Sequence, residues 1–441
     1  MVKSVLLAFF VLFFCVIIMC VFRKKNKTLH SRNYIDPMTF FTGGLFVYSI
    51  VGAFDWKQIE STTSLTIYVL TILLGYIAFS FGYLISVREE YSFDSRYKKI
   101  SFSMKAGIIE GKTVQVVDCL MILLLLLLII TNRNSFIQLF TKFGSGNSYV
   151  DSAIRADRTA FSGAQSLMES FFGLFMIAFP TYRIYKTSKI TLIDLAVLLA
   201  YAVFSLASGY RSELVTIGIA VLVIINYRVK RLSFKELAIM GVTALLLLVS
   251  VGHLRRFSNI GQMIQMLKTE GLSLFRLGSS GEFSNTTGTF FSYINAIKNG
   301  TRQFDIGLSW LTDIAMFIPT FLWRSRPLPL AEQYMKEFFP NAPEGTGHGW
   351  FVMNTGYMAF GIIGVIIELF VLGVVLAKVF NFFMKRKEDS LIMTMYVYLL
   401  LFVFTLARGS FIGAVKNYLL QVLPLIIVYY VSHHIKVGRK I

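Results

Sequence analysis

The sequence predicts an all-α polytopic membrane protein with about eleven transmembrane helices and one large extracytoplasmic loop. Of its 441 residues, 55% are hydrophobic, and several apolar runs exceed the roughly 18 residues that mark a membrane span. These runs show no alternation of apolar and polar residues. Because an apolar run in lipid can satisfy its backbone hydrogen bonds only as a helix, the expected fold is a helical bundle.

The apolar runs define eleven expected spans in chain order. Their residues are 5–22, 38–54, 64–87, 114–131, 166–185, 192–208, 212–227, 237–252, 357–383, 391–407 and 412–432. The segment 305–323 is also apolar, but Asp305, Asp313 and Pro319 interrupt it. A twelfth crossing there would also place the basic loop 385–387 outside the cytoplasm. We therefore expect an interfacial or re-entrant helix at this point.

Basic loops fall on one side of the membrane if the chain alternates through eleven spans. They are 23–27, 96–112, 183–189, 227–231, 385–387 and the C-terminal tail. Since such loops stay in the cytoplasm, the N-terminus and the loops 132–165 and 253–356 are expected outside, and the C-terminus inside. The expected organisation is helices one to eight in 1–252, a large outer loop with short or re-entrant helices in 253–356, and helices nine to eleven in 357–441.

Composition excludes several functional classes. The net charge of +19 does not indicate a nucleic-acid partner, because most of it flanks membrane helices. Cys15, Cys20 and Cys119 lie inside apolar runs, so we expect neither a disulfide framework nor a metal site. Neither a GxxxxGK[ST] nor an HExxH pattern is present, so nucleotide-driven pumping and zinc hydrolysis have no support. The first run lacks a small-residue cleavage site, which favours a retained helix over a signal peptide.

The outer segments favour arginine, whereas the inner loops use mostly lysine. The outer arginines are Arg133, Arg155, Arg158, Arg211, Arg255, Arg256, Arg276, Arg302, Arg324, Arg326 and Arg408. Positive-inside sorting does not explain cations on the outside. A guanidinium group is a planar fork that holds phosphate bidentately, so this face indicates an anionic substrate such as a phosphate or diphosphate. The structural alternative for each arginine is contact with lipid headgroups.

Two of these arginines stand at the outer ends of tight helix hairpins. Arg211 follows Gly209 in SLASGYRSELV, and Arg408 precedes Gly409 and Ser410 in FTLARGSF. They belong to different hairpins but to the same membrane face. They are therefore placed to converge on one diphosphate, with interfacial anchoring as the alternative.

The acid-base candidates are Glu282 in SSGEFSNTTG and His348 in EGTGHGW, both in the large loop. Their glycine-rich surroundings allow the backbone to approach a ligand closely. Histidine titrates near neutral pH, whereas a carboxylate needs burial to do so. An ordinary polar role is the alternative for His348. Glu368 is an acidic residue deep in a span, where transport coupling or a structural contact with another helix would explain it.

Several motifs together resemble the Wzy-type O-antigen or capsular polysaccharide repeat-unit polymerases. They are a G-x-R motif opening a helix at Gly209 to Arg211, the arginine-bearing outer loop, and the following helix GYMAFGIIG at 356–364. The likeness covers most of the chain as architecture and only short motifs as sequence. In the family an acidic residue often precedes the aromatic and glycine pair. Asn354 stands there in this chain, which argues against a carboxylate role at that position and favours Glu282 and His348 instead.

The resemblance implies a glycosyltransferase of the type-C-like membrane class without a cofactor. It would transfer a growing glycan from undecaprenyl diphosphate to the non-reducing end of an undecaprenyl diphosphate-linked repeat unit, independently of metal and with inversion. Arg211 and Arg408 would clamp the diphosphate, Arg276 and Arg256 would assist, and His348 or Glu282 would be the base. The implied location is the bacterial inner membrane, with lipid, a chain-length regulator and a flippase as partners.

Two other functions stay open at this point. An O-antigen ligase would use a similar donor with a lipid A core acceptor, and His348 keeps that reading open. A flippase for lipid-linked oligosaccharides would be a transporter. It would be expected to line a central cavity with charges from many helices and to lack a long outer loop.

Overall fold

The computed structural model describes residues 34–51, 61–87, 101–103, 112–131, 164–208, 211–254, 282–318, 322–342 and 349–437. The α-helices in these ranges are α2 (Pro37–Leu45), α3 (Thr62–Ser86), α4 (Lys112–Thr131), α7 (Ala164–Thr187), α8 (Leu192–Ser208), α9 (Arg211–Ile224), α10 (Phe234–Leu254), α12 (Glu282–Lys298), α13 (Leu308–Ala315), α14 (Leu330–Phe338), α15 (Asn354–Lys385), α16 (Ser390–Leu406) and α17 (Phe411–Val437). Two π-helical segments, η1 (Phe46–Val51) and η4 (Ile225–Val229), extend α2 and α9.

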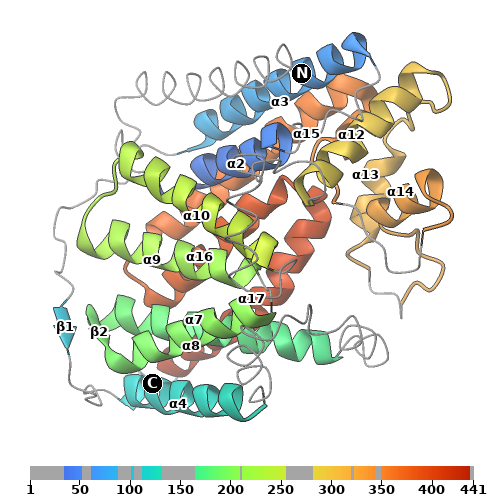
Figure 1. Cartoon of the computed structure of the whole chain (residues 1–441). Coiled ribbons are helices and arrows are strands. Elements are labelled where there is room, and N and C mark those ends of the chain that lie inside the picture. The colour runs from blue at the N-terminus through green and yellow to red at the C-terminus, as the bar shows by residue number, and fades with distance from the viewer. Residues whose placement is uncertain are drawn as a thin grey trace, which may run out of the picture.

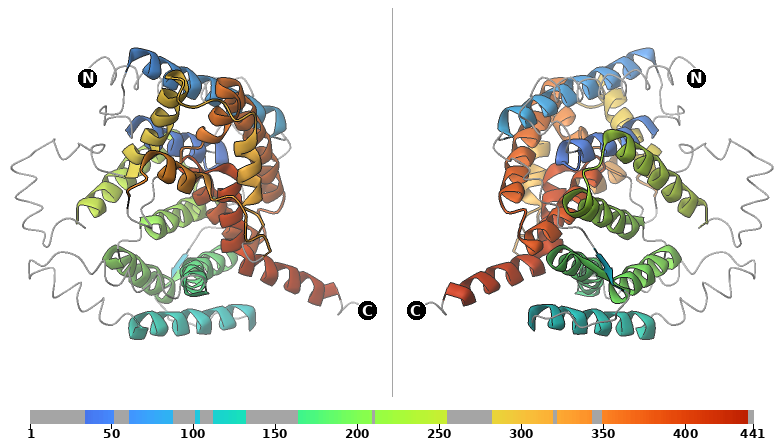
Figure 2. Two further views of the ribbon diagram at one scale, coloured as in Figure 1. Left: turned by 90° about the vertical axis from the view of Figure 1, so that its right-hand side faces the viewer. Right: turned by 90° about the vertical axis from the view of Figure 1, so that its left-hand side faces the viewer.

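The helices form a bundle in which α16 is central. Nearly every residue of α16 is buried, and the helix contacts α2, α7, α9, α15 and α17. A helix that is apolar on all sides belongs in the interior of a large bundle. In Figure 1, α2, α3 and α15 lie on one side of the bundle and α4, α7 and α8 on the other. The C-terminal part of α17 projects away from the rest (Figure 2).

Two groups of short elements mark opposite ends of the bundle (Figure 1). At one end the strand β1 (Ser101–Ser103) pairs in parallel with β2 (Lys189–Thr191), with Ser101 opposite Lys189. At the other end lie α12, α13 and α14. Here α14 packs on α12 through an aromatic cluster that includes Tyr293, Tyr334 and Trp350.

Three helices in the described ranges are long and apolar enough to cross a membrane, namely Thr62–Ser86, Asn354–Lys385 and Phe411–Tyr430. Three shorter apolar helices are Val114–Ile130, Leu192–Ser205 and Ser390–Leu406. Each expected span from 38–54 onward overlaps a helix or a helix with its π-helical extension, whereas 5–22 and 52–54 lie outside the described residues. The number of crossings and the side to which each loop belongs stay predictions.

Within the described ranges the most extensive helix–helix contact is that of α3 with α15, and glycines make it close. An added Cβ at Gly82 would lie 2.3 Å from the carbonyl oxygen of Phe370, and one at Gly373 would lie 2.2 Å from that of Phe79. Since no side-chain atom fits in that space, the two backbones are in direct contact. Small residues of this kind allow membrane helices to gain van der Waals contact over their length.

The expected span 357–383 is not one continuous helix. Phe360 and Gly361 have non-helical backbone angles, and Gly361 has a φ of 63°, which favours glycine. Residues eight apart in a straight helix would be separated by about 12 Å. Here an added Cβ at Gly356 would lie 2.8 Å from the carbonyl carbon of Gly364. The first turn of α15 therefore folds back against the long part that follows the break.

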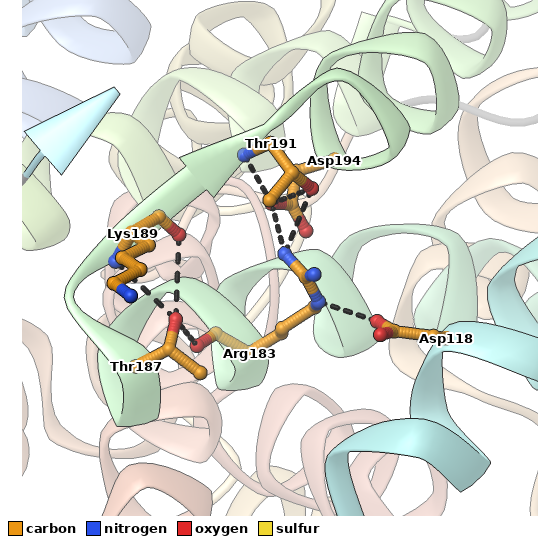
Figure 3. Close-up of polar contacts among 6 residues, drawn as sticks. All are labelled: Asp118, Arg183, Thr187, Lys189, Thr191 and Asp194. Atoms are coloured by element: carbon orange, nitrogen blue, oxygen red, sulfur yellow. Dashed lines mark hydrogen bonds and ion pairs between the residues drawn. The ribbon is translucent and has the colours of Figure 1, made fainter. Parts of the chain in front are cut away.

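A buried ion-pair cluster ties α4, α7 and α8 together (Figure 3). Arg183 is fully buried, and its Nε donates to Asp118 of α4. Its Nη1 lies 2.6 Å from an Asp194 carboxylate oxygen of α8 and 2.8 Å from the Thr191 hydroxyl of β2. The sequence pattern had grouped Arg183 with the basic loop 183–189. The structure shows instead that this guanidinium group is an internal link between three helices.

Candidate functional site

Arg408 lies in the turn of residues 407–410, the Arg408 turn, which joins α16 to α17. The backbone N–H of Arg408 donates to the Thr405 carbonyl at 2.9 Å, which holds the turn to the end of α16. The N–H of Val352 donates to the Ala407 carbonyl at 3.2 Å. The Arg408 turn is therefore fixed both to its own helix and to the segment that enters α15.

Three distant parts of the chain meet at Gly349, namely its own segment, α12 and the Arg408 turn. An added Cβ on Gly349 would lie 3.2 Å from Nε of Arg408 and 2.1 Å from the hydroxyl oxygen of Thr286. No side chain fits at such a distance, so glycine is required here. Gly349 directly follows His348, and Thr286 lies one helical turn after Glu282 on α12. Gly349, beside His348, and Thr286, one turn after Glu282, therefore lie close to Arg408, which is predicted to bind the diphosphate.

A buried polar chain continues from this contact into the bundle. The Thr289 hydroxyl of α12 lies 2.8 Å from the Thr286 carbonyl and 3.3 Å from the Gly349 carbonyl. It accepts a hydrogen bond of 2.8 Å from the side-chain amide of Asn354, the first residue of α15. The side-chain carbonyl of Asn354 is buried and has no partner among the described residues. Oδ1 of Asn354 is therefore a buried hydrogen-bond acceptor close to the candidate site, with no donor among the described residues.

Asp313 of α13 caps the start of α17 from another part of the chain. One carboxylate oxygen accepts from the Ser410 hydroxyl at 2.5 Å, and the other from the backbone N–H of Ile412 at 3.1 Å. Burial raises the pKa of Asp313 above its usual value, and the hydrogen bonds from Ser410 and Ile412 oppose this rise. Asp313 therefore holds the end of the Arg408 turn in place.

Replacing Asp313 by Ala is expected to destabilise the protein by about 0.5–2 kcal/mol, the usual cost of losing a helix N-cap. Asp313→Asn keeps an acceptor and should cost less. Because the folded-state pKa is raised, the folded protein binds this proton more readily than the unfolded chain does. The contribution of Asp313 to stability should therefore fall as pH rises through the window between the usual and the raised pKa. The Asn variant should lack this dependence in thermal unfolding.

Asp389 provides a matched control for Asp313. It is the N-cap residue directly before α16, where its carboxylate accepts from the backbone N–H groups of Leu391 at 2.8 Å and Ile392 at 3.3 Å. Asp389→Ala should lower stability by a similar amount and leave the activity of the protein unchanged, whereas Asp313→Ala should alter both. Equal activities of the two variants would show that Asp313 does not position Arg408.

The other predicted site residues are described less fully. Arg211 is the first residue of α9, which packs against α16, and Glu282 is the first residue of α12. For these two only the backbone position is described. His348, Arg256 and Arg276 lie outside the described residues. Whether Arg211 and Arg408 converge on one ligand therefore stays a prediction.

One outer arginine is engaged in a structural contact. Arg302 pairs with Glu337 of α14, and its guanidinium carbon lies 4.8 Å from the centre of the Tyr293 ring. This pair fastens α14 to α12. Of the outer arginines whose side chains are described, Arg302 therefore gives the least support to a substrate role.

The site includes contacts that the sequence did not reveal. Glu368 accepts a hydrogen bond of 3.3 Å from the indole N–H of Trp310 and another from the backbone N–H of Gly356. It thus links α13 to the folded-back turn of α15, which favours the structural contact over transport coupling. An acidic residue within a span indicates that a partner exists, but the sequence does not show that the partner of Glu368 is Trp310, which is 58 residues away. No group of three or more His, Cys, Asp or Glu side chains that could hold a metal occurs within the described ranges.

Comparison with known proteins identifies the family. No curated protein and no solved structure matches the chain. The family model described as O-antigen polysaccharide polymerase Wzy matches residues 1–437. That range contains both the bundle and the Arg408 turn with its neighbours. The chain therefore belongs to the Wzy family of O-antigen polysaccharide polymerases.

Proposed function

We propose that this protein polymerises lipid-linked oligosaccharide repeat units as a type-C-like, inverting and metal-independent glycosyltransferase. The donor is a growing glycan on undecaprenyl diphosphate, and the acceptor is the non-reducing end of an undecaprenyl diphosphate-linked repeat unit. Membership of the polymerase family supports the reaction class. The single structural observation that carries the site is the contact of Gly349 with both Arg408 and α12.

The reaction assigned to this site is one displacement at the anomeric carbon of the donor. The acceptor hydroxyl oxygen forms a bond to that carbon while the bond from the carbon to the diphosphate oxygen breaks. His348 or Glu282 takes the hydroxyl proton, and undecaprenyl diphosphate leaves with the bonding electron pair. Arg408 and Arg211, assisted by Arg276 and Arg256, stabilise the negative charge that grows on the diphosphate.

The leaving group explains why neither a nucleotide nor a metal is required in this proposal. A diphosphate is already a good leaving group, and fixed guanidinium groups can neutralise its charge without a cation from solution. The proposal places the Arg408 turn and α12 to α14 on the periplasmic side of the inner membrane, where lipid-linked repeat units would be polymerised. A flippase would deliver the substrate, and a chain-length regulator would contact the polymerase.

Reconstitution tests this function with purified protein in liposomes and undecaprenyl diphosphate-linked repeat units as the only substrate. We expect a ladder of products on a gel that persists in EDTA. Arg211→Ala should abolish long products, because the charge on the leaving diphosphate loses a partner. The amount of membrane-inserted protein should not change, since Arg211 opens a helix at its end.

Other outcomes of the same assay would contradict the proposal. A ladder of normal length from Arg211→Ala would remove that residue from the site. Loss of the ladder in EDTA would contradict metal independence. Transfer of the glycan only to an added lipid A core acceptor would indicate a ligase. Movement of the lipid-linked unit across the bilayer without polymerisation would indicate a flippase.

A further inference from the structure

Helix α13 is amphipathic in the reverse sense to a helix on a water-soluble protein. Its exposed residues are apolar, with Leu308 61%, Leu311 64% and Ile314 52% exposed. Its buried residues include the polar Ser309, Thr312 and Asp313. Water would favour the opposite arrangement.

The polar side of α13 is accounted for by bonds to neighbouring helices. The Ser309 hydroxyl donates to the Thr355 carbonyl at 3.0 Å, and Asp313 binds the start of α17. With eight residues, the helix is far too short to span a bilayer. We therefore assign its exposed side to lipid at the membrane interface, as the sequence predicted for this segment.

Two cations meet at the C-terminal end of α13. Nζ of Lys416, on α17, lies 2.8 Å from the carbonyl oxygen of Met316. Nη1 of Arg326 lies 3.4 Å from the same oxygen and 2.7 Å from the Ile318 carbonyl oxygen. We call Lys416 and Arg326 the α13 cation pair. Carbonyl groups and the helix dipole attract positive charge to such a helix end.

The α13 cation pair has an excess of positive charge. Neither member forms an ion pair with a carboxylate among the described residues. Arg324, which is exposed, adds a third cation on the same segment as Arg326. Because like charges held around one carbonyl repel each other, an anion between them would stabilise the arrangement.

Apolar and aromatic side chains surround these cations. Phe317 is 42%, Leu322 69% and Trp323 38% exposed. Tryptophan is enriched at the level of lipid headgroups, where an apolar ring with a polar N–H fits best. The indole N–H of Trp323 donates to the Ser325 hydroxyl at 3.0 Å, in line with that position.

We propose that the α13 cation pair binds the phosphate of an anionic phospholipid, whose acyl chains lie along the exposed side of α13. A ligand that matches both features must carry negative charge at one end and be apolar along its length. The exposed side of α13 is open to its surroundings over Leu308, Leu311 and Ile314, which suits bilayer lipid rather than a substrate that must be enclosed for reaction. Bound lipid would hold α13, and through Asp313 the Arg408 turn, at a fixed depth.

The test uses the full chain, extracted in mild detergent and titrated with phosphatidylglycerol, with bound lipid counted by native mass spectrometry. The variant Lys416→Gln/Arg326→Gln should bind phosphatidylglycerol about thirtyfold more weakly, as expected for the loss of two interfacial cations that contribute about 1 kcal/mol each. Lys416→Arg should retain binding, since it keeps the charge. The matched control Lys336→Gln/Arg386→Gln removes two cations elsewhere and should bind as the unaltered protein does.

Three results would overturn the proposal. The first is equal binding by the double variant and the unaltered protein. The second is the same loss in the control variant, which would indicate unspecific attraction of charge. The third is displacement of phosphatidylglycerol by an equimolar polyprenyl diphosphate, which would make this a substrate site. Arg326→Gln alone, on an exposed segment, provides the comparison if the double variant does not fold.

Discussion

Replacing Arg408 by Ala is expected to slow polymerisation by about 100- to 1,000-fold, the usual effect of removing one donor that stabilises a developing anion. Arg408 is the one member of the predicted clamp whose side chain is described, and it lies against Gly349. The fork of its guanidinium group can bind a diphosphate at two points. Arg408→Lys should therefore recover only part of the rate. Initial rates of ladder formation with the reconstituted protein measure both effects.

Arg386 is the matched control for this substitution. It lies in the turn before α16, as Arg408 lies in the turn after it, and its guanidinium carbon is 4.2 Å from the centre of the Phe382 ring. Arg386→Ala should leave the rate and the length of the product unchanged. If Arg408→Ala also polymerises at the normal rate, Arg408 does not hold the leaving diphosphate.

A second variant tests the geometry without removing the arginine. Gly349→Ala would place a Cβ 2.1 Å from the hydroxyl oxygen of Thr286 and 3.2 Å from Nε of Arg408, so one of them must move. We expect a rate between those of the unaltered protein and Arg408→Ala. Adding Thr286→Ala removes the closer clash and should restore part of the rate. No rescue would indicate that Gly349 acts through the backbone instead.

Apolar runs predicted the helices to within a few residues, because in a chain of this composition hydrophobic length is a local property. The expected span 166–185 is the helix Ala164–Thr187, and 391–407 is Ser390–Leu406. The segment around Asp313 was expected to be an interfacial or re-entrant helix, because polar residues interrupt its apolar run. The helix α13 there has eight residues, and its position relative to the membrane stays a prediction.

The arrangement of the site could be predicted only in part. Arg408 and Arg211 were selected because glycine-containing turns put them at helix ends, and both helix ends are as expected. The break at Gly361 was not predicted, because GYMAFGIIG is apolar throughout. The folded-back turn depends on contacts of Gly356 with Gly364 and Glu368, and a single sequence does not reveal such contacts.

The role of Arg183 was missed for a related reason. Its position beside a basic loop made it one more cytoplasmic cation, although Asp118 and Asp194 lie inside the apolar runs on either side. Acidic residues within membrane spans need a partner, so Asp118 and Asp194 could have indicated a buried cation near them. Asp118 is 65 residues from Arg183, so only the packing of α4 on α7 brings the two together.

Replacing Arg183 by Met is expected to destabilise the protein by about 3–5 kcal/mol, the usual cost of removing one partner from a buried ion pair. The guanidinium group is fully buried between two carboxylates, and Met fills similar space without charge. Asp118 and Asp194 would then be buried with no cation beside them. Thermal unfolding in detergent should show a lower midpoint, and less protein should reach the membrane.

The triple variant Asp118→Leu, Arg183→Met, Asp194→Leu separates charge from shape. Removing the whole buried cluster often costs little, because the desolvation of three charges is removed together with their attraction. The triple variant should therefore be more stable than Arg183→Met alone. Part of this gain is offset, because the triple variant also loses the hydrogen bonds from Thr191 to Asp194. The exposed Lys186→Ala on the same helix should leave the midpoint unchanged. A normal midpoint for Arg183→Met would mean that this cluster does not hold α4, α7 and α8 together.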